Sequence, residues 1–191
     1  MATAVLAVQG AFAEHEARLA ELGETCVELR QASDLRQRFD RLVLPGGEST
    51  TQGKLLAELG MLEPLRECIE DGMPVLATCA GLILLARHLD AHDAHDDRDT
   101  PRIATLDVLV RRNAYGRQLG SFRTSLELAG MGTVPATFIR APFVMETGRG
   151  VETLATCDGN VVAVQQGKQL ALAFHPELDE DPRIHQLFLD L

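Results

Sequence analysis

Three short stretches of the sequence combine residue types that could carry out nucleophilic catalysis. "PVLATCAGLILLA" holds one thiol, Cys79, among small neighbours, and "LALAFHPE" ends with His175 and Glu177 two residues apart. "LVLPGGESTT" places Gly46 and Gly47 ahead of a polar stretch that opens a helix. A thiol, an imidazole and a carboxylate can form a nucleophile–base–orienter triad, and a glycine pair can present backbone N–H groups to a ligand.

Cys79 lies in a sharp turn if a strand ends at Thr78 and a helix begins at Ala80. That is the geometry of a nucleophile elbow, in which small flanking residues relieve crowding and the side chain is exposed at the carboxyl edge of the sheet. The start of the helix also directs backbone N–H groups and its positive dipole end at the sulfur, which favours the reactive thiolate. The alternative is a buried structural cysteine, which is common in apolar surroundings.

His175 differs from the other histidines because it ends an apolar strand. Catalytic groups in an α/β sheet collect at the carboxyl ends of strands, so His175 and Cys79 could meet there. Pro176 keeps the backbone at His175 out of the helical region, and residues two apart in an extended stretch face the same way, so Glu177 can reach the imidazole. The alternative is a surface turn. The others lie on an early helix (His15), in an acidic loop (His88, His92, His95) or in the terminal helix (His185).

The glycine pair predicts an oxyanion hole. The N–H of Gly47, together with the N–H of Ala80, would stabilise a tetrahedral acyl intermediate. A phosphate-binding loop is the competing interpretation, but the glycines are not followed by the GK[ST] pattern. A plain loop-to-helix turn is the remaining alternative.

The elements that position these residues alternate between strand and helix in the first half of the chain. We expect a helix from about Gln52 to Leu59, capped by Ser49 and Thr50, and another at Ala80–Leu89. This alternation implies a mostly parallel sheet covered on both faces. The predicted strands of this half are Thr3–Val8, Cys26–Leu29, Arg41–Leu44 and Met73–Thr78. The other predicted helices are Phe12–Leu22, Ser33–Arg38 and Glu63–Asp71.

The second half of the chain is richer in strands. "CDGN" and "QGKQ" suggest hairpins, and the chain closes with an amphipathic helix at Pro182–Leu191. We therefore expect an α/β fold, a doubly wound and mostly parallel sheet with an antiparallel extension, as one domain over residues 1–191. The predicted strands of this half are 103–111, 119–123, 136–140, 153–157, 160–166 and 169–174.

Composition excludes several classes of protein. The chain has 191 residues, 46% of them hydrophobic, which suffices for one good core. The net charge of -10, without a basic stripe, argues against nucleic-acid binding. No stretch approaches the ~20 apolar residues of a membrane helix, and no signal peptide is evident. The four cysteines show no CxxC pairing, which predicts reduced thiols in a cytoplasmic protein.

One acidic segment invites a metal interpretation. "HLDAHDAHDDRDTP" (88–101) mixes imidazoles with carboxylates, both of which bind metal ions. A solvated loop is favoured, because ordering a flexible run of ligands is costly. We therefore predict no metal site.

The three stretches together resemble the class I, triad-type glutamine amidotransferases. More narrowly, the chain resembles the glutaminase subunits of pyridoxal 5′-phosphate synthase, the enzyme of vitamin B6 biosynthesis. "VQGAFAEH" (8–15), "PGGESTT" (45–51), "VRRNAYGRQ" (110–118), "FIRAP" (138–142) and "FHPEL" (174–178) carry the likeness over nearly the whole chain. The resemblance implies a flavodoxin-like amidotransferase fold.

The resemblance also implies an activity, a substrate and a partner. Cys79 would attack L-glutamine, with His175 as base and Glu177 as its orienter, giving glutamate and ammonia by way of a thioester. The ammonia would pass to a (β/α)8-barrel synthase, which forms a ring of subunits that each carry one glutaminase. No cofactor is implied. The substrate-binding positions that match are Gly47, Glu48, Ser49, Arg112, Ile139 and Arg140.

Two rival functions remain at this point. One is a glutaminase that feeds a different synthase, such as that of histidine biosynthesis, although "RNAYGRQ" and "IRAP" argue against it. The other is a cysteine-elbow redox sensor or chaperone, which would need the thiolate but neither the "HPE" pair nor the two glycines. A binding subunit with a decayed site is disfavoured by the intact Cys79, His175 and Glu177.

Overall fold

A half-sheet of five parallel strands forms the centre of the protein. The structure is a computed structural model that describes residues 2–90, 100–112 and 121–191. Neighbouring strands in this half run in the order β2-β1-β3-β4-β12, and every adjacent pair is parallel. The five strands are β1 (Ala2–Leu6), β2 (Thr25–Leu29), β3 (Arg41–Leu44), β4 (Val75–Thr78) and β12 (Gln169–Leu172).

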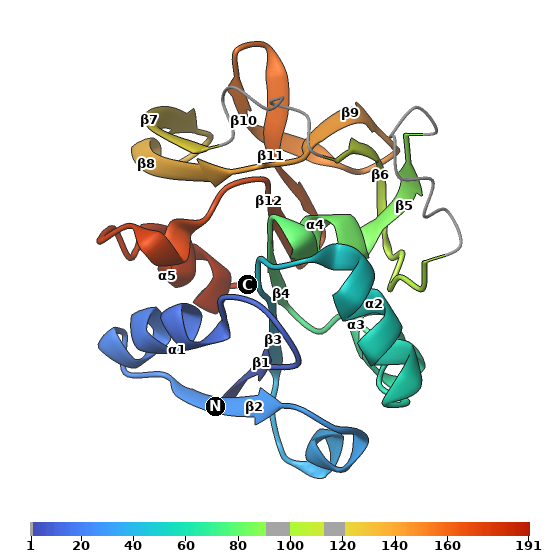
Figure 1. The fold of residues 1–191 in the computed structure, drawn as a ribbon. Helices are drawn as coiled ribbons and strands as arrows, with labels where there is room; N and C mark the ends of the chain where they lie inside the picture. The colour runs from blue at the N-terminus through green and yellow to red at the C-terminus, as the bar shows by residue number, and fades with distance from the viewer. Residues whose placement is uncertain (1, 91–99, 113–120) are drawn as a thin grey trace.

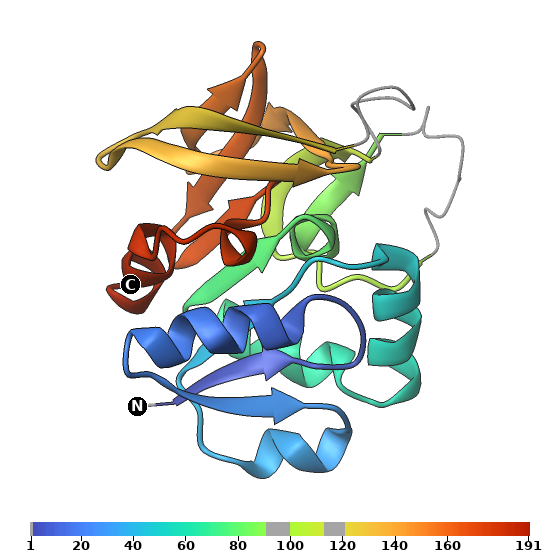
Figure 2. The same ribbon diagram turned by 60° about the vertical axis from the view of Figure 1, so that its left-hand side comes forward.

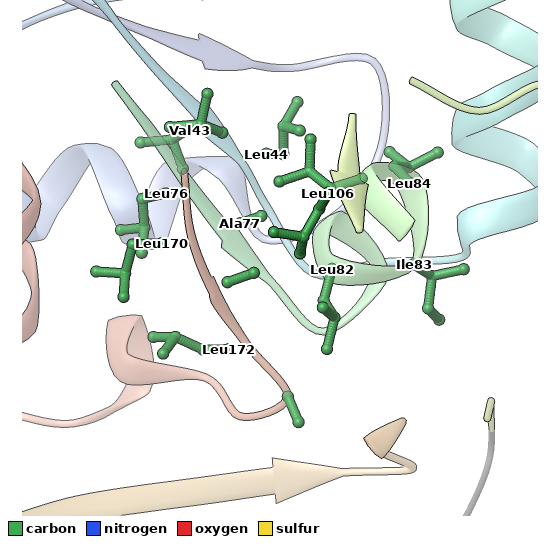
Figure 3. Packing of buried hydrophobic residues seen from close by; sticks show 14 of the residues in the cluster. Val43, Leu44, Leu76, Ala77, Leu82, Ile83, Leu84, Leu106, Leu170 and Leu172 are labelled. Carbon is green, nitrogen blue, oxygen red and sulfur yellow. The ribbon is translucent and has the colours of Figure 1, made fainter. Parts of the chain in front are cut away.

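Helices cover both faces of these strands. Figure 1 shows α1 and α5 on one side of β1, β3 and β4, and α2 and α3 on the other. The central strands are therefore apolar on both faces, and Val43, Leu76 and Leu170 are fully buried between the layers (Figure 3). The helical elements are α1 (Phe12–Glu21), η1 (Ala32–Arg36), α2 (Ser49–Glu58), α3 (Leu62–Glu70), α4 (Ala80–Leu85), η2 (Pro176–Leu178) and α5 (Arg183–Leu189).

Antiparallel strands extend the sheet beyond β12. The order continues β12-β11-β9-β6-β5, with β10 paired to β11, and only β5 and β6 are parallel in this part. Strands β7 and β8 form a separate two-stranded sheet, seen as a long hairpin in Figure 2. The strands are β5 (Ala86–Leu89), β6 (Leu106–Arg111), β7 (Ser121–Leu128), β8 (Gly132–Ile139), β9 (Phe143–Thr147), β10 (Glu152–Cys157) and β11 (Asn160–Gln166).

The predicted fold class is confirmed. The sheet is mostly parallel in its first half with an antiparallel extension, and the hairpins predicted at "CDGN" and "QGKQ" join β10 to β11 and β11 to β12. Most other predicted elements are present with ends that move by a few residues. The largest shifts are in β7 and β8, which are longer than the predicted strands at 119–123 and 136–140. Residues 119 and 120 lie outside the described part.

The predicted helix at Ala80–Leu89 is wrong in its second half. Helix α4 ends at Leu85, and Ala86, with φ -61° and ψ 129°, begins strand β5. Every residue of α4 is buried, so the segment has no polar face whose period could distinguish helix from strand. Strand β9 (Phe143–Thr147) was also not predicted.

The predicted cap of helix α2 is wrong as well. The helix already begins at Ser49, and Glu48 is its N-cap residue. The carboxylate of Glu48 accepts hydrogen bonds from the N–H groups of Thr50 (3.1 Å) and Thr51 (2.7 Å) and from the Thr51 hydroxyl. A carboxylate at this position satisfies the open N–H groups as well as a hydroxyl would.

Across residues 2–90, 100–112 and 121–191, no helix combines the length and apolarity that a membrane crossing requires.

Candidate active site

Cys79 occupies the sharp turn between β4 and α4. Its backbone has φ 48° and ψ -98°, a conformation that residues other than glycine rarely adopt. The turn is held by neighbouring strands, because the Cys79 N–H donates to the Leu172 carbonyl at 2.8 Å. Strain of this kind persists only where surrounding structure fixes it, and it is typical of functional sites. The thiol faces the Ile139 carbonyl, with a sulfur–oxygen distance of 3.9 Å.

His175 lies beyond the end of β12, where the sequence predicted it. Its backbone N–H donates to the Thr137 carbonyl at 2.8 Å, which fastens it to β8. Its Nδ1 lies 2.6 Å from Oε1 of Glu177, and both side chains are buried. The Nε2 atom has no hydrogen-bond partner among the described residues. The ring is therefore oriented by Glu177 through Nδ1 and keeps Nε2 available for a proton.

The electrostatics of this pair favour the imidazolium form of His175. Burial alone would lower the pKa of His175, but interactions with Cys79 and the Glu177 carboxylate raise it to about 10. Burial alone would raise the pKa of Glu177, yet His15 and His175 together hold it below its usual range. Glu177 is therefore a carboxylate at neutral pH, and His175 binds a proton tightly.

The loop that carries Gly46 and Gly47 between β3 and α2, called here the glycine loop, passes directly beside His175. A side chain at Gly46 would bring its first carbon within 2.3 Å of the imidazole Cε1, so only glycine fits. The Gly46 carbonyl accepts from the Ala11 N–H at 3.0 Å, and the Gly46 N–H donates to the Thr78 hydroxyl at 3.0 Å. The loop is thus tied both to the residue before Cys79 and to the start of α1.

These elements enclose a pocket of about 680 Å³. It brings together most of the residues singled out from the sequence, although they come from distant parts of the chain. Glu177 lies behind His175 rather than in the lining, and Ala80 is buried at the start of α4. The predicted residues that line the pocket are Gly47, Glu48, Ser49, Cys79, Arg112, Ile139, Arg140 and His175.

Three of the lining residues come from the antiparallel part of the fold. Arg112 follows β6, is largely buried, and reaches the Thr50 hydroxyl with Nη1 at 3.5 Å. Ile139 ends β8 and is 37% exposed, and Arg140 follows it with φ 44°. The pocket is thus lined by two guanidinium groups, those of Arg112 and Arg140.

Two buried histidines were not predicted to belong to the site. Nε2 of His15, on α1, lies 3.3 Å from Oε2 of Glu177, and its Nδ1 lies 3.0 Å from Nε2 of His185 on α5. The sequence did contain a signal, because His15 falls on the same helical face as Phe12 and Leu19. A polar residue on an apolar face needs a buried partner.

The acidic segment cannot be compared with its prediction. Residues 91–99, which include His92 and His95, lie outside the described part, as do residues 113–118 of the "RNAYGRQ" motif. Within the described ranges, no group of three or more His, Cys, Asp or Glu side chains could hold a metal ion. All four cysteines are free in the structure.

Comparison with known proteins decides the family. The model of the SNO glutamine amidotransferase family matches residues 5–191. The chain belongs to that family. A "Pyridoxal 5′-phosphate synthase subunit PdxT" from Desulfitobacterium hafniense (strain Y51) is 58% identical to this amidotransferase over 100% of the chain and 92% of the relative. One from Methanocorpusculum labreanum (strain ATCC 43576 / DSM 4855 / Z) is 49% identical over 100% of the chain and 97% of the relative.

Solved structures agree with this amidotransferase fold. A structure described as "Crystal structure of glutamine amidotransferase" superimposes with a TM-score of 0.92 at 43% identity, over 100% of this chain and 98% of that one. A glutamine amidotransferase from Thermotoga maritima reaches a TM-score of 0.64 at 16% identity, over 99% of this chain and 82% of the other. At that identity the likeness concerns the fold alone.

Proposed function

We propose that this protein is the glutaminase subunit of a pyridoxal 5′-phosphate synthase, acting as one domain over residues 1–191 in the cytoplasm. The proposal rests chiefly on one observation: a strained cysteine and a carboxylate-oriented histidine with an open Nε2 line the same pocket. The names of the PdxT relatives support the choice of pathway.

A proton that passes from Cys79 to Nε2 of His175 gives a thiolate–imidazolium pair, which the raised pKa of His175 favours before the substrate arrives. The thiolate attacks the side-chain amide carbon of L-glutamine, a C–S bond forms, and the amide oxygen takes the negative charge. When the tetrahedral intermediate collapses, the C–N bond breaks and His175 returns the proton to the departing ammonia. Water then attacks the thioester carbon while His175 takes a proton from that water, the C–S bond breaks, His175 passes that proton to the sulfur, and glutamate is released. Glu177 stabilises the imidazolium in both halves.

Two backbone N–H groups would stabilise the oxyanion. Ala80 follows the nucleophile at the start of α4, and Gly47 lies across the pocket in the loop after β3. Donors fixed in place before the reaction gain most in a site that excludes water. The barrel partner would activate the enzyme by ordering this loop, and Gln9 is the residue from which we expect contacts with the partner.

The substrate would lie between the glycine loop and the two arginines. The forked guanidinium of Arg112 or Arg140 suits the α-carboxylate of glutamine, because it can bind both oxygens. Gly47, Glu48, Ser49 and Ile139 would complete the binding site. The Glu48 carboxylate already caps α2, so its contribution would come from the edge of the cap or from its backbone.

The ammonia would pass directly to a (β/α)8-barrel synthase, with one glutaminase on each subunit of a ring. The alternatives are a glutaminase that serves another synthase, such as that of histidine biosynthesis, and a redox or chaperone protein. The first would release glutamate equally but would not respond to this partner. The second has no use for the Glu177-oriented imidazole beside the thiol.

Glutamate release from L-glutamine tests the proposal. Wild-type protein and Cys79→Ala are assayed alone and with the cognate barrel synthase, and Cys68→Ala serves as a matched control because Cys68 lies outside the pocket. We expect activity that rises with the synthase, is retained in Cys68→Ala, and falls by at least roughly 10,000-fold in Cys79→Ala. No glutamate from the folded wild type under either condition would overturn the proposal.

A further inference from the structure

A chain of buried polar groups continues behind the His175–Glu177 pair. His15 and His185 are both completely buried and come from helices α1 and α5, far apart in the sequence. Nδ1 of His15 lies 3.0 Å from Nε2 of His185, and Nε2 of His15 lies 3.3 Å from Oε2 of Glu177. Neither histidine lines the pocket, so neither can touch the substrate.

The protons in this chain can be assigned from the contacts. Oε1 of Glu177 is bound by His175, whereas the buried Oε2 has no hydrogen bond within the described residues and lies 3.3 Å from Nε2 of His15. A lone pair on that nitrogen would face a carboxylate oxygen and repel it, so Nε2 of His15 carries the hydrogen. Nδ1 of His15 must then be the acceptor, and His185 donates to it through its own Nε2–H.

Burial favours the neutral form of both imidazoles. Burial lowers the pKa of His15 against the opposing charge of Glu177, and burial with the neighbouring His15 lowers the pKa of His185 to about 3. A neutral N–H donor can orient a buried carboxylate without adding a second positive charge that would compete with the imidazolium of His175. The other titratable groups that act on the pair are His175, Glu14 and Arg18.

His15 also contacts the nucleophile side of the site. Its Nε2 lies 3.1 Å from the Thr78 hydroxyl, which accepts the N–H of Gly46 at 3.0 Å. Thr78 is the last residue of β4 and directly precedes Cys79. Nε2 of His15 therefore lies 3.1 Å from the hydroxyl that anchors the glycine loop and 3.3 Å from the carboxylate of the triad.

We propose that His15, held by His185, is a positioning residue that fixes the Glu177 carboxylate and, through it, the tautomer and orientation of His175. The inference rests on the proposed function. It assigns a purpose to two buried histidines that packing alone does not require, because an apolar side chain would fill the same space at no polar cost.

The test compares His15→Gln with His15→Asn. The longer glutamine amide can place an N–H where Nε2 of His15 lies, whereas the shorter asparagine reaches only the position of Nδ1. Both are neutral and polar, so they form a matched pair. With the synthase present we expect kcat for glutamine to fall roughly 30-fold in His15→Asn and at most about 3-fold in His15→Gln, with KM within about 2-fold in both.

A second readout does not depend on glutamine turnover. In the full-length chain carrying Cys79→Ala, the protonation of His175 is followed by nuclear magnetic resonance as pH is raised. Weaker positioning of Glu177 stabilises the imidazolium less, so the midpoint should move to lower pH by about one pH unit in His15→Asn and stay in place in His15→Gln. A loss of packing alone would not separate the two variants.

The outcomes separate this inference from the proposed function. Equal kcat and equal His175 midpoints for the two folded variants would overturn the positioning role, even if the wild type releases glutamate. An inactive wild type with the expected midpoint difference would instead overturn the proposed function alone. If His15→Asn does not fold, His185→Phe takes its place. This variant removes the donor to Nδ1 of His15, which is the contact that fixes the His15 tautomer with its N–H toward Glu177. Unchanged kcat and an unchanged His175 midpoint in His185→Phe would overturn the inference.

Discussion

The parallel and antiparallel strands supply different kinds of residue to the pocket. Cys79, the glycine loop and His175 follow the parallel strands β4, β3 and β12, whereas Arg112 and Arg140 follow β6 and β8 in the antiparallel part. Parallel strands all end at the same edge of the sheet, so the groups that follow them converge without further design. Antiparallel strands alternate in direction, and only every second end can reach that edge.

Anchoring differs in the same way, and so does burial except at Arg112, which is only 9% exposed. Cys79, His175 and Glu177 are 8%, 6% and 2% exposed, and the backbones of the first two are hydrogen-bonded to neighbouring strands. Ile139, by contrast, is 37% exposed. Chemistry needs fixed groups in a dry environment, whereas recognition of a charged substrate tolerates groups at a wetter rim. The comparison predicts that changes in the first region lower kcat and changes in the second raise KM.

Among variants that keep the Cys79 thiol, the largest effect is expected for Glu177→Gln. The amide keeps the size of the side chain but cannot stabilise an imidazolium, so kcat should fall roughly 100- to 1,000-fold with little change in KM. The Glu177 carboxylate helps to raise the pKa of His175 to about 10, and its loss lowers that pKa. The alkaline limb of kcat/KM should therefore move to lower pH, which a pH–rate profile measures. An unshifted limb would contradict the assigned role of Glu177.

A smaller and different effect is expected for Arg112→Lys. An ammonium cannot bind both oxygens of a carboxylate, so KM for glutamine should rise roughly 10-fold while kcat stays within about 3-fold. Arg111→Lys is the matched control, because the Arg111 guanidinium pairs instead with Asp90 at 2.6 Å. Steady-state kinetics of the two variants decide the point. An effect confined to kcat would contradict a substrate-binding role for Arg112 and indicate a role in the chemical step.

The smallest effect on activity is expected for Asp179→Asn, at the contact between the segment after His175 and strands β7 and β8. Asp179 is buried, pairs with Arg123 at 2.6 Å, and lies 3.1 Å from the Thr137 hydroxyl on β8. Asp179→Asn should lower the free energy of unfolding by about 1–3 kcal/mol, because the ion pair is lost from a buried position. Kcat should change by less than about 3-fold. Denaturant unfolding measures the first quantity, and exposed Glu180→Gln is the matched control.

The same division explains what could be predicted from the sequence. The parallel half was predicted well because short apolar runs alternate with amphipathic ones, and because Cys79 and His175 fall at strand ends. Strand β5 ("ARHL") was predicted as the end of a helix because Ala80–Leu89 as a whole has the length and propensity of one. Strand β9 was missed for a different reason, since "FVMET" has a single buried residue, Val144. Such segments acquire their structure from the neighbours against which they pack.

The polar contacts that complete the site could not be predicted from local patterns. Glu48 replaces Ser49 and Thr50 as the cap of α2, and glutamate is not one of the usual N-cap residues that a sequence pattern would point to. His15 and His185 are 170 residues apart, and only the packing of α1 and α5 against the sheet brings them together. Side chains on an apolar helical face indicate that a buried partner exists, but not which one.

Trapping the covalent intermediate tests directly whether Cys79 is the nucleophile that attacks glutamine. Wild-type protein with the cognate synthase is mixed with L-glutamine, quenched in acid during turnover, digested and examined by mass spectrometry. The account predicts a glutamyl group on the peptide that contains Cys79, and no adduct in Cys79→Ala or after glutamine is exhausted. Glutamate release without any adduct on Cys79, or with an adduct on another residue, would contradict it.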